Sequence, residues 1–443
     1  MIKKITFHRT LAFTIASLAA LHSHAGMGTV GTNYGVLPLD MASAQSLSMF
    51  NTQVSSSYYN PAYLVKDPRG ELTVGIMHSK QELRASSVNR DGDVVSNTPS
   101  QHILIGMKSN LSSLTNTNHP IQLGFMTGVE QHGEEMLGFE SKTSEEGQFF
   151  GYGREPLFLT IGMGTQIWRG IDIGLAIRIT LEASATLNAV SDLSGETKQE
   201  AISVNAKPVL RGIVSVNFDY GNTFCPEKTC FLSGFESALA YREASATKTT
   251  IESNITVDQI VPSPGLRIAV ATVDSFQPQI ITLGTQYQSD DWRVGITLEH
   301  QKWSDLGNEF KGDSIKDQAG ISDALKLAFN DTIIPRIGAE IKLNGNFSVT
   351  TGLSFEKSPL ENTQSPDVNY FDNDKYIAGL GISALFEKTK ILVYPVKFDL
   401  AYQYHMLKER DFSITPFGTE TATEVVETDG NIHVLSGSMT LKF

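Results

Sequence analysis

The chain has 443 residues, a formal net charge of −13, 40% hydrophobic residues and two cysteines. A protein that binds nucleic acid through the phosphate backbone needs a basic surface, so this acidity argues against such a partner. After the first 25 residues, no stretch approaches the ~18 uninterrupted apolar residues of a membrane-spanning helix, which excludes helical spans.

The first 25 residues have the features of a secretory signal peptide. Lys3, Lys4 and Arg9 form a positive start, an apolar run extends from Leu11 to Leu21, and residues 23–25 suit a cleavage site. A membrane anchor is the alternative, but the run is shorter than the ~20 residues that a span needs. Removal of the three positive charges would change the formal net charge from −13 to −16.

Residues 26–68 do not alternate as strands do and are rich in Gly, Ser, Asn and Ala. A disordered tail is one interpretation. The segment nevertheless contains many apolar residues, namely Met27, Tyr34, Leu37, Leu39, Met41, Leu47, Met49, Phe50, Tyr58 and Tyr59. A barrel of more than ~8 strands has an interior to fill. We therefore predict that residues 26–68, called the hatch from here on, plug the barrel that follows.

Residues 69–443 are predicted to form that barrel, because polar and apolar residues alternate in about fourteen segments from Glu71 onward. A period of two is typical of β-strands. Segments such as Ile171–Leu187 and Tyr394–Met406 are longer than the ~5–6 residues of soluble strands and suit tilted membrane strands. The fold class is therefore all-β, a single transmembrane antiparallel β-barrel of about fourteen strands.

The last eleven residues, His433–Phe443, alternate almost without exception. One face carries His433, Leu435, Gly437, Met439, Leu441 and Phe443, and the other carries Val434, Ser436, Ser438, Thr440 and Lys442. In a soluble protein such a final strand would be an open, aggregation-prone edge. We expect it to pair with the segment near Leu72, which leaves Phe443 at the periplasmic rim.

Connections between the segments alternate between tight turns and long loops. Tight turns are expected at Arg169-Gly170, Ser289–Asp291 and Asn344-Gly345, the last as a type I′ hairpin. Long outer loops are expected at Gly133–Glu155, Thr256–Gln277, Ser304–Asp331, Ser358–Asp374 and Glu409–Asp429. Within Ser304–Asp331 a short helix is predicted from the spacing of Ile321, Ala324, Leu325 and Ala328, with coil as the alternative.

Cys225 and Cys230 are expected to form a local disulfide in an exported chain, with two free thiols as the alternative. Strand parity places their loop on the periplasmic side. No histidine lies close to them, so we predict no metal site and no cofactor.

Apolar residues on otherwise polar, inward faces are candidates for a ligand pocket, and packing against the hatch is the equally weighted alternative. These are Met77, Leu104, Met126 and Phe158. Inward cations are candidates for binding a ligand carboxylate, although acidic neighbours favour ion pairs within the lumen. These are Arg178, Arg211, Arg293, Arg336 and Lys397.

One motif resembles a known family. Residues 57–64 (SYYNPAYL) contain Asn60-Pro61-Ala62, which is similar to the signature in the hatch of the FadL/TodX long-chain fatty acid and hydrocarbon transporters. Further similar segments follow in order, namely Pro278–Tyr287, Trp292–Gly295, Gln301–Ser304, Asn330–Thr332, Arg336–Glu340 and Gly352–Pro359. The resemblance is weak from Val88 to Ile260, and the mature start Gly26-Met27-Gly28 departs from the family.

The resemblance implies uptake of a hydrophobic small molecule across the outer membrane of a Gram-negative bacterium, by an internal apolar pocket and a lateral exit in the wall. An apolar route suits such a cargo, because exposing an alkyl chain to water costs ~0.8 kcal/mol per methylene. We expect a monomer that is surrounded by outer-membrane lipid and inserted by the barrel-assembly machinery through its last strand.

Three other functions make different demands on the sequence. A general or substrate-selective porin would need an open lumen, and an adhesive or structural barrel would rely on the acidic loop Glu130–Glu155. A hydrolase finds no support in the sequence, which has no Gly-x-Ser-x-Gly elbow, so we predict no enzymatic activity.

Overall fold

The computed structural model describes residues 34–88, 97, 99–114, 116, 119–131, 137–141, 144–148, 157–191, 197–225, 230–257, 261–306, 329–361, 364–366, 368–370, 372–388, 392–415 and 424–443. Within these ranges, no helix is both long and apolar enough to cross a bilayer. The predicted signal peptide, residues 26–33 and the helix predicted from Ile321, Ala324, Leu325 and Ala328 lie outside the described residues.

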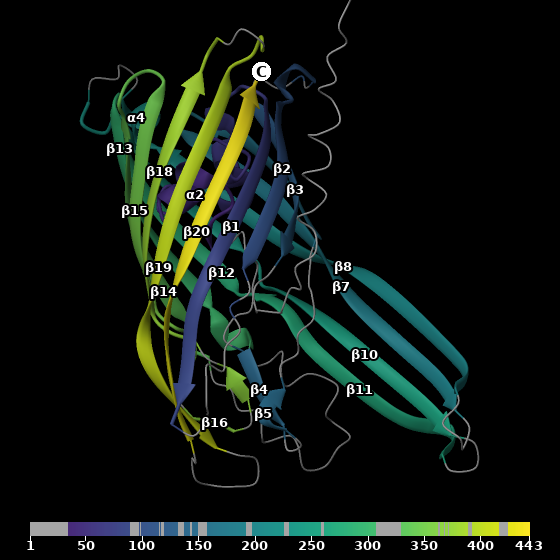
Figure 1. The fold of residues 1–443 in the computed structure, drawn as a ribbon. Helices are drawn as coiled ribbons and strands as arrows, with labels where there is room; N and C mark the ends of the chain where they lie inside the picture. The colour runs from purple at the N-terminus through teal and green to yellow at the C-terminus, as the bar shows by residue number, and fades with distance from the viewer. Residues whose placement is uncertain are drawn as a thin grey trace, which may run out of the picture.

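Fourteen antiparallel strands form a closed ring, as the alternation predicted (Figure 1). In order around the ring they are β1 (Glu71–Ser87), β2 (Ser100–Asn110), β3 (Ile121–Gln131), β6 (Leu157–Trp168), β7 (Ile171–Ser191), β8 (Thr197–Asp219), β9 (Phe235–Arg242), β12 (Gln279–Gln288), β13 (Trp292–Lys302), β14 (Thr332–Lys342), β15 (Phe347–Glu356), β18 (Lys375–Phe386), β19 (Val396–Thr415) and β20 (Glu424–Lys442).

The seam between the first and last strands confirms the expected closure. Leu72 pairs with Leu441, and the backbone N–H of Phe443 donates to the carbonyl of Gly70 at 2.9 Å. Burial alternates residue by residue along the wall, so that Ile76 and Leu435 are more than half exposed to lipid while their neighbours face the lumen. This is the pattern that a barrel needs when one face meets lipid and the other encloses a filled interior.

The rim nearest Phe443 holds the tight connections. Thr223 donates from its hydroxyl to the carbonyl of Arg169 at 3.0 Å, which places the helix α4 (Tyr220–Phe224) and the following Cys225–Cys230 disulfide at this rim. The disulfide is thus confirmed. The type I′ turn was wrong, because neither Asn344 nor Gly345 has a positive φ, and the connection uses residues 343–346. Instead the Asn344 side chain accepts the N–H of Phe347 at 2.9 Å.

The prediction of an outer loop was wrong for Thr256–Gln277 and for Glu409–Asp429, because both segments are largely strand. β10 (Ser245–Val257) and β11 (Val261–Gln277) continue β9 and β12 outward, and β19 and β20 extend well into the expected loop Glu409–Asp429. β10 pairs with β11 and, in parallel, with the outer part of β7 (Figure 1). Strands that reach beyond the lipid need no continuous apolar outer face, so alternation is interrupted in them, for example at Thr247–Thr250.

The other expected outer loops contain short elements. β4 (Leu137–Ser141), β5 (Ser144–Gln148) and β17 (Val368–Tyr370) form a small separate sheet, and β16 (Gln364–Pro366) pairs with β19. Two single-turn helices, η3 (Ser112–Leu114) and η4 (Trp303–Asp305), follow β2 and β13.

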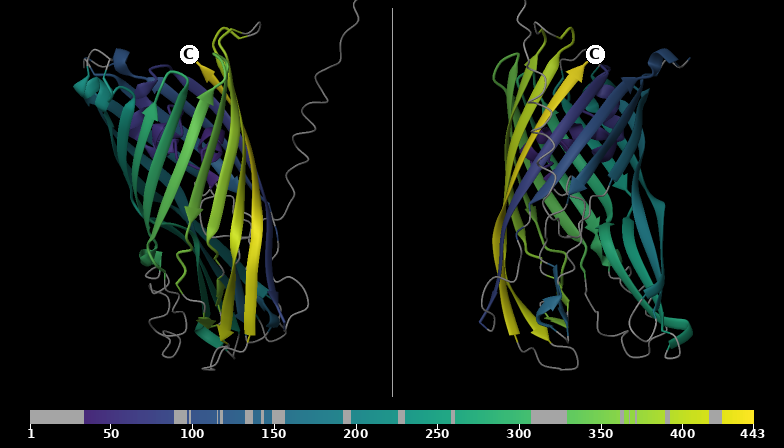
Figure 2. Two further views of the ribbon diagram at one scale, coloured as in Figure 1. Left: turned by 90° about the vertical axis from the view of Figure 1, so that its left-hand side faces the viewer. Right: turned by 45° about the vertical axis from the view of Figure 1, so that its right-hand side comes forward.

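Residues 34–68 of the hatch lie inside the ring, in the half nearer the C-terminus, and the further views in Figure 2 show them between the strands of the wall. Its residues 38–66 form four short helices joined by turns, α2 (Pro38–Ala42), η1 (Ser48–Phe50), α3 (Ser56–Tyr59) and η2 (Pro61–Lys66). Its apolar residues from Tyr34 to Leu64 are buried, including Leu37, Phe50 and Tyr58. Helices of one turn are not stable alone, so packing against the wall must hold them in place.

Candidate functional site

The Asn60-Pro61-Ala62 motif forms the turn that attaches the hatch to the wall. Asn60 ends α3, and Pro61 begins η2, where its missing N–H leaves no unsatisfied donor. The Asn60 side chain donates from Nδ2 to the carbonyl of Met49 at 2.7 Å. The N–H of Ala62 donates to Oγ of Ser215 on β8 at 2.9 Å. The motif therefore ties the hatch both to itself and to the barrel.

Inward-facing glycines allow the hatch backbone to touch the wall. A Cβ added at Gly174 would lie 2.0 Å from the nitrogen of Ala62, and one at Gly352 would lie 2.0 Å from the carbonyl oxygen of Ser43. Seven further wall glycines would also bring a Cβ closer than 3.0 Å to hatch atoms, namely Gly106, Gly124, Gly164, Gly295, Gly338, Gly379 and Gly381. Any side chain at these positions would require the hatch to move, so the glycines specify one docked position.

A buried carboxylate organises the hatch interior. Asp40 accepts the N–H of Leu37 at 3.0 Å and a hydrogen bond from Nδ2 of Asn51 at 3.2 Å. Burial raises its pKa to about 6, although hydrogen bonds from Ser48, Asn51, Leu37 and Ser55 oppose the shift. Asp40 is therefore the hatch group whose charge changes nearest to neutral pH.

The end of the hatch is held at the periplasmic rim by charge. Nζ of Lys66 lies 3.3 Å from Asp172, 2.9 Å from Asp219 and 3.1 Å from Glu236, which belong to three adjacent strands. Burial alone would lower the pKa of Lys66, but the three carboxylates outweigh it and raise the pKa. The hydroxyl of Tyr63 also donates to Glu236, at 2.7 Å. The last turn of the hatch is thus bound to β7, β8 and β9.

The four residues predicted for a ligand pocket all point inward and are buried. Leu104, Met126 and Phe158 pack with hatch residues such as Tyr58, and Met77 packs in the cluster that contains Tyr34. None of the four lines the cavity described below. In this closed arrangement their inward apolar surface contacts the hatch, and a ligand would reach it only after the hatch shifts.

Four of the five predicted cations have a carboxylate partner in the lumen. Their pairs are Arg178–Glu130 at 3.3 Å, Arg293–Glu340 at 2.6 Å, Arg336–Glu356 at 3.0 Å and Lys397–Asp399 at 2.8 Å. Arg211 differs, because the contacts of its guanidinium within the described residues are to oxygen atoms of neutral groups, among them the Tyr58 hydroxyl at 3.3 Å.

Tyr58 of the hatch lies among three buried arginines. The guanidinium carbons of Arg178 and Arg242 are 5.4 Å and 4.9 Å from its ring centre, within cation–π range, and Arg211 donates to its hydroxyl. Burial alone would raise the pKa of Tyr58, but the arginines hold it below its usual value. Arg242, which also pairs with Glu299 at 2.5 Å, is missing from the predicted set, although its inward position could have been read from the alternation of β9.

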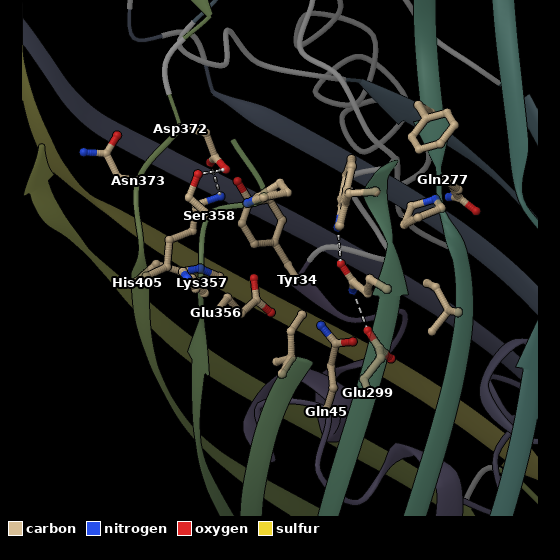
Figure 3. Close-up of a pocket in the computed structure, with 18 of the residues that line it drawn as sticks. Tyr34, Gln45, Gln277, Glu299, Glu356, Lys357, Ser358, Asp372, Asn373 and His405 are labelled. Carbon is tan, nitrogen blue, oxygen red and sulfur yellow. Dashed lines mark hydrogen bonds and ion pairs between the residues drawn. The ribbon is translucent and has the colours of Figure 1, made fainter. Parts of the chain in front are cut away.

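A cavity of about 160 Å³ lies between the hatch and the outer part of the lumen (Figure 3). Hatch residues Tyr34, Gln45 and Tyr58 line one side, and wall residues line the rest, including Arg211, Glu299 and Glu356. On the wall side, the indole N–H of Trp303 donates to Gln301 at 2.7 Å, and the side-chain amide of Gln301 donates to Glu299 at 2.6 Å. Small-molecule sites usually occupy ~300–1,000 Å³, so this cavity would hold only part of a long chain in the closed state.

Comparison with known proteins identifies the barrel. The family model described as outer membrane protein transport protein (OMPP1/FadL/TodX) matches residues 32–443. The chain belongs to this family. It is 56% identical over 439 residues to alkane uptake protein A of Marinobacter nauticus, with 98% of this chain and 96% of that protein covered.

Solved structures agree on the fold of this FadL/TodX-family chain. A Pseudomonas aeruginosa FadL homologue matches with a TM-score of 0.58 at 11% identity, covering 95% of this chain and 99% of that one. The toluene transporter TodX of P. putida matches with a TM-score of 0.54 at 12% identity, covering 93% and 99%. The family predicted from Asn60-Pro61-Ala62 is thus confirmed. The predicted location, the outer membrane of a Gram-negative bacterium, is confirmed as well.

Proposed function

We propose that this outer-membrane transport protein takes up long, unbranched n-alkanes. The observation that carries the proposal is the 56% identity to an alkane uptake protein over nearly the whole chain. A lumen whose hatch is docked closely against wall glycines further favours selective uptake over an open pore. The proposal involves no catalytic step, and the barrel would work as a monomer in outer-membrane lipid after insertion through β20 by the barrel-assembly machinery.

A neutral cargo suits the charge balance of the lumen. A desolvated fatty acid carboxylate needs a cation that is free to bind it, whereas an alkane needs none. Arg178, Arg293 and Arg336 are already paired with carboxylates, so recruiting one of them for a ligand would break an existing ion pair. For Arg178 it would also leave the buried carboxylate of Glu130 without its partner. Arg211, which lines the cavity, is the remaining candidate for a carboxylate anchor, and it defines the alternative in which the cargo is a fatty acid.

The proposed route begins at the cavity and continues after the hatch shifts. The shift would uncover the inward surface of Leu104, Met126 and Phe158, with Met77 nearby, as an apolar pocket. The flexible side chains of methionine suit an imprecise, chain-shaped ligand. The cargo would then leave sideways into lipid, since release into the periplasm would expose each methylene to water at a cost of ~0.8 kcal/mol.

Radiolabelled n-hexadecane tests the proposal in two ways. The purified barrel should retain it in detergent, and host cells that express the barrel should take it up faster than cells with an empty vector. Unlabelled n-hexadecane should displace the bound label more effectively than palmitate does. Preferential displacement by palmitate would favour the fatty acid alternative, and absence of both binding and uptake would refute the proposed function.

A second measurement separates uptake from porin activity. The wild-type barrel in a planar bilayer should show no large steady conductance, because the docked hatch fills the lumen. Arg211→Gln should then weaken palmitate binding and leave n-hexadecane uptake within about twofold of wild type, since a neutral chain gains nothing from a fixed charge. A steady current from the wild-type barrel would favour the porin.

A further inference from the structure

A second cavity, of about 230 Å³, lies between the hatch and the periplasmic rim of the barrel. Its hatch side is formed by residues 50–53 together with Leu39 and Tyr63. Its wall side includes the turn residues Gln288 and Ser289 and four cations, namely Arg293, Lys342, Lys397 and Lys442. The volume is below the ~300–1,000 Å³ of sites for drug-sized ligands, so this cavity suits a small solute. It is called the rim cavity from here on.

The hatch remains accessible at the rim cavity. All residues from Tyr34 to Leu64 are described, and Thr52 is the one among them that is not buried. The carbonyl of Thr52 accepts Nζ of Lys108 on β2 at 2.7 Å. Its hydroxyl group makes no hydrogen bond to another described residue. A solute that enters the rim cavity from the periplasm therefore meets a polar group of the hatch at this position.

The four cations of the rim cavity converge from separate strands. Arg293 is the second residue of β13, and Lys397 is the second residue of β19. Lys342 and Lys442 are the last residues of β14 and β20. All four strand ends lie at the periplasmic rim. Among the described residues that line the rim cavity, Glu340 is the single carboxylate. The lining is therefore predominantly cationic.

The carboxylates that pair with two of these lysines already have other donors. Asp399 pairs with Lys397 at 2.8 Å and also accepts hydrogen bonds from three uncharged side chains. Asp67 pairs with Lys442 at 3.0 Å. It also accepts two hydrogen bonds from the guanidinium of Arg69, both at 2.8 Å. These carboxylates therefore do not depend on the lysines alone for their hydrogen bonds.

The ammonium groups of the rim cavity, in contrast, have donors to spare. An ammonium group carries three N–H donors. Within the described part of the chain, Lys342, Lys397 and Lys442 each contact a single acceptor residue. For Lys342 this acceptor is the backbone carbonyl of Asp290, at 2.8 Å. The rim cavity therefore offers more hydrogen-bond donors than acceptors, and an oxyanion is the ligand that such a site satisfies.

The kind of cation favours a phosphate group over a carboxylate. The planar guanidinium of arginine matches a carboxylate best, whereas lysine acts as a point charge that binds phosphate. The arginine of the rim cavity, Arg293, already pairs with Glu340 at 2.6 Å. It also donates to the carbonyl of Phe50 at 2.8 Å. The three lysines are thus the cations that have donors available for a ligand.

We propose that the rim cavity binds a phosphate group, which bridges Thr52 of the hatch to the lysines of the wall and stabilises the docked hatch. A ligand that binds only the docked arrangement adds to its stability by mass action. The inference goes beyond the proposed function, because it concerns the control of the hatch and does not depend on the identity of the cargo. Ordered water in the rim cavity is the alternative, and it predicts no response of the hatch to phosphate.

Titration of the purified barrel with inorganic phosphate tests both parts of the proposal. Calorimetry in dodecyl maltoside, at constant ionic strength, should show saturable binding. Exchange of those hatch amides that open only on undocking should slow by a factor of 1 + [phosphate]/Kd, which is about tenfold at ten times the Kd. KCl at the same ionic strength should not slow the exchange, which separates binding from charge screening.

Two variants locate the bound phosphate. Lys342→Gln, which removes an exposed charge, should weaken phosphate binding at least about fivefold, and so should Thr52→Val, which removes the hydroxyl group of the hatch. Thr52→Ser keeps that hydroxyl group and should bind as wild type does. Lys388→Gln is the matched control, because Lys388 is exposed at the same rim and does not line the rim cavity. Without phosphate, hatch exchange in Lys342→Gln should equal that of wild type, which excludes a folding defect.

The source of the phosphate group is tested separately. In nanodiscs of phosphatidylglycerol without added phosphate, slow hatch exchange that Lys342→Gln abolishes would identify a lipid head group as the ligand. Slow exchange that requires added inorganic phosphate would identify a free solute. Both results support the site, since the recognised group is the same.

Three outcomes would overturn the inference. The first is the absence of saturable phosphate binding to the wild-type barrel. The second is wild-type affinity in both Lys342→Gln and Thr52→Val, because phosphate would then bind elsewhere. The third is hatch exchange that does not respond to bound phosphate, because the site would then not control docking. Tighter binding of citrate than of phosphate would overturn the assignment of a phosphate group. None of these outcomes bears on n-hexadecane uptake, which tests the proposed function.

Discussion

Gly174→Ala is expected to undock the hatch by adding a single carbon atom. The new Cβ would lie 2.0 Å from the nitrogen of Ala62 and 2.3 Å from the carbonyl carbon of Pro61. Both are backbone atoms, so no side-chain rotation relieves the clash, and the Asn60-Pro61-Ala62 turn must leave the wall. This movement also breaks the 2.9 Å hydrogen bond from Ala62 to Ser215.

The size of the effect follows from two costs and one gain. Overpacking costs ~1–3 kcal/mol, and an unsatisfied buried N–H costs ~1–3 kcal/mol more. Replacing glycine by alanine also stabilises the folded state by ~0.4–1 kcal/mol, because alanine lowers the conformational entropy of the unfolded chain. This gain is too small to offset the two costs. A net cost of ~1–5.5 kcal/mol would shift the ratio of docked to undocked hatch by ~5-fold to ~10,000-fold.

Conductance and hydrogen exchange measure this shift. Gly174→Ala should show frequent current steps in planar bilayers, and the amides of η2 should exchange faster than in wild type. Gly437→Ala is the control, because Gly437 lies on the lipid-facing row and a Cβ there meets only the Asp399 carbonyl oxygen, at 3.9 Å. Wild-type conductance together with unchanged exchange in Gly174→Ala would refute the inference that wall glycines fix the hatch.

Three further predictions concern the hatch and its contacts. Deleting residues 26–68 should let small solutes leak through the barrel, and unchanged permeability of such cells would mean that the segment is not a plug. Because burial raises the pKa of Asp40 to about 6, hatch docking should be strongest below pH ~4 and weaken as pH rises through about 6. Hydrogen exchange of the hatch amides, corrected for the intrinsic exchange rate, should show this pH dependence in wild type. The same measurement on Asp40→Asn should not show it. Met126→Asp, which would bury an unpaired carboxylate, should abolish n-hexadecane binding while the barrel still folds, whereas lipid-facing Ile105→Asn should retain binding; undiminished binding by Met126→Asp would move the pocket elsewhere.

The wall could be predicted from the sequence because lipid and lumen impose opposite demands on neighbouring residues. Leu441 and its partner Leu72 face lipid, Thr440 and Thr73 face the lumen, and this contrast repeats along each strand. Beyond the lipid the contrast disappears. The outer strands β10 and β11 satisfy their backbone groups by pairing with each other, and only short alternating runs, such as Leu266–Val270, mark them in the sequence.

The site could be predicted only in part, because an inward apolar residue has the same sequence pattern whether it packs against the hatch or contacts a ligand. Phe158 packs against the hatch in the closed state, and its sequence neighbourhood cannot distinguish that role from ligand contact. The partner of each cation depends on how the strands align with one another. Glu130 and Arg178, for example, form an ion pair although they belong to different strands. The docking surface for the hatch could have been predicted from glycines such as Gly174 and Gly352, because the alternation places them on inward faces. Composition alone does not reveal this.

The continuity of the hatch with β1 determines how the transporter resets. The hatch leads directly into the seam where Gly70 meets Phe443, and Asp67 pairs with Lys442 there at 3.0 Å. A displaced hatch thus stays tethered and searches for its docking surface at an effective concentration of the order of millimolar. Reclosure would then be an intramolecular event. A tethered hatch of this kind would keep any leak as brief as the displacement itself.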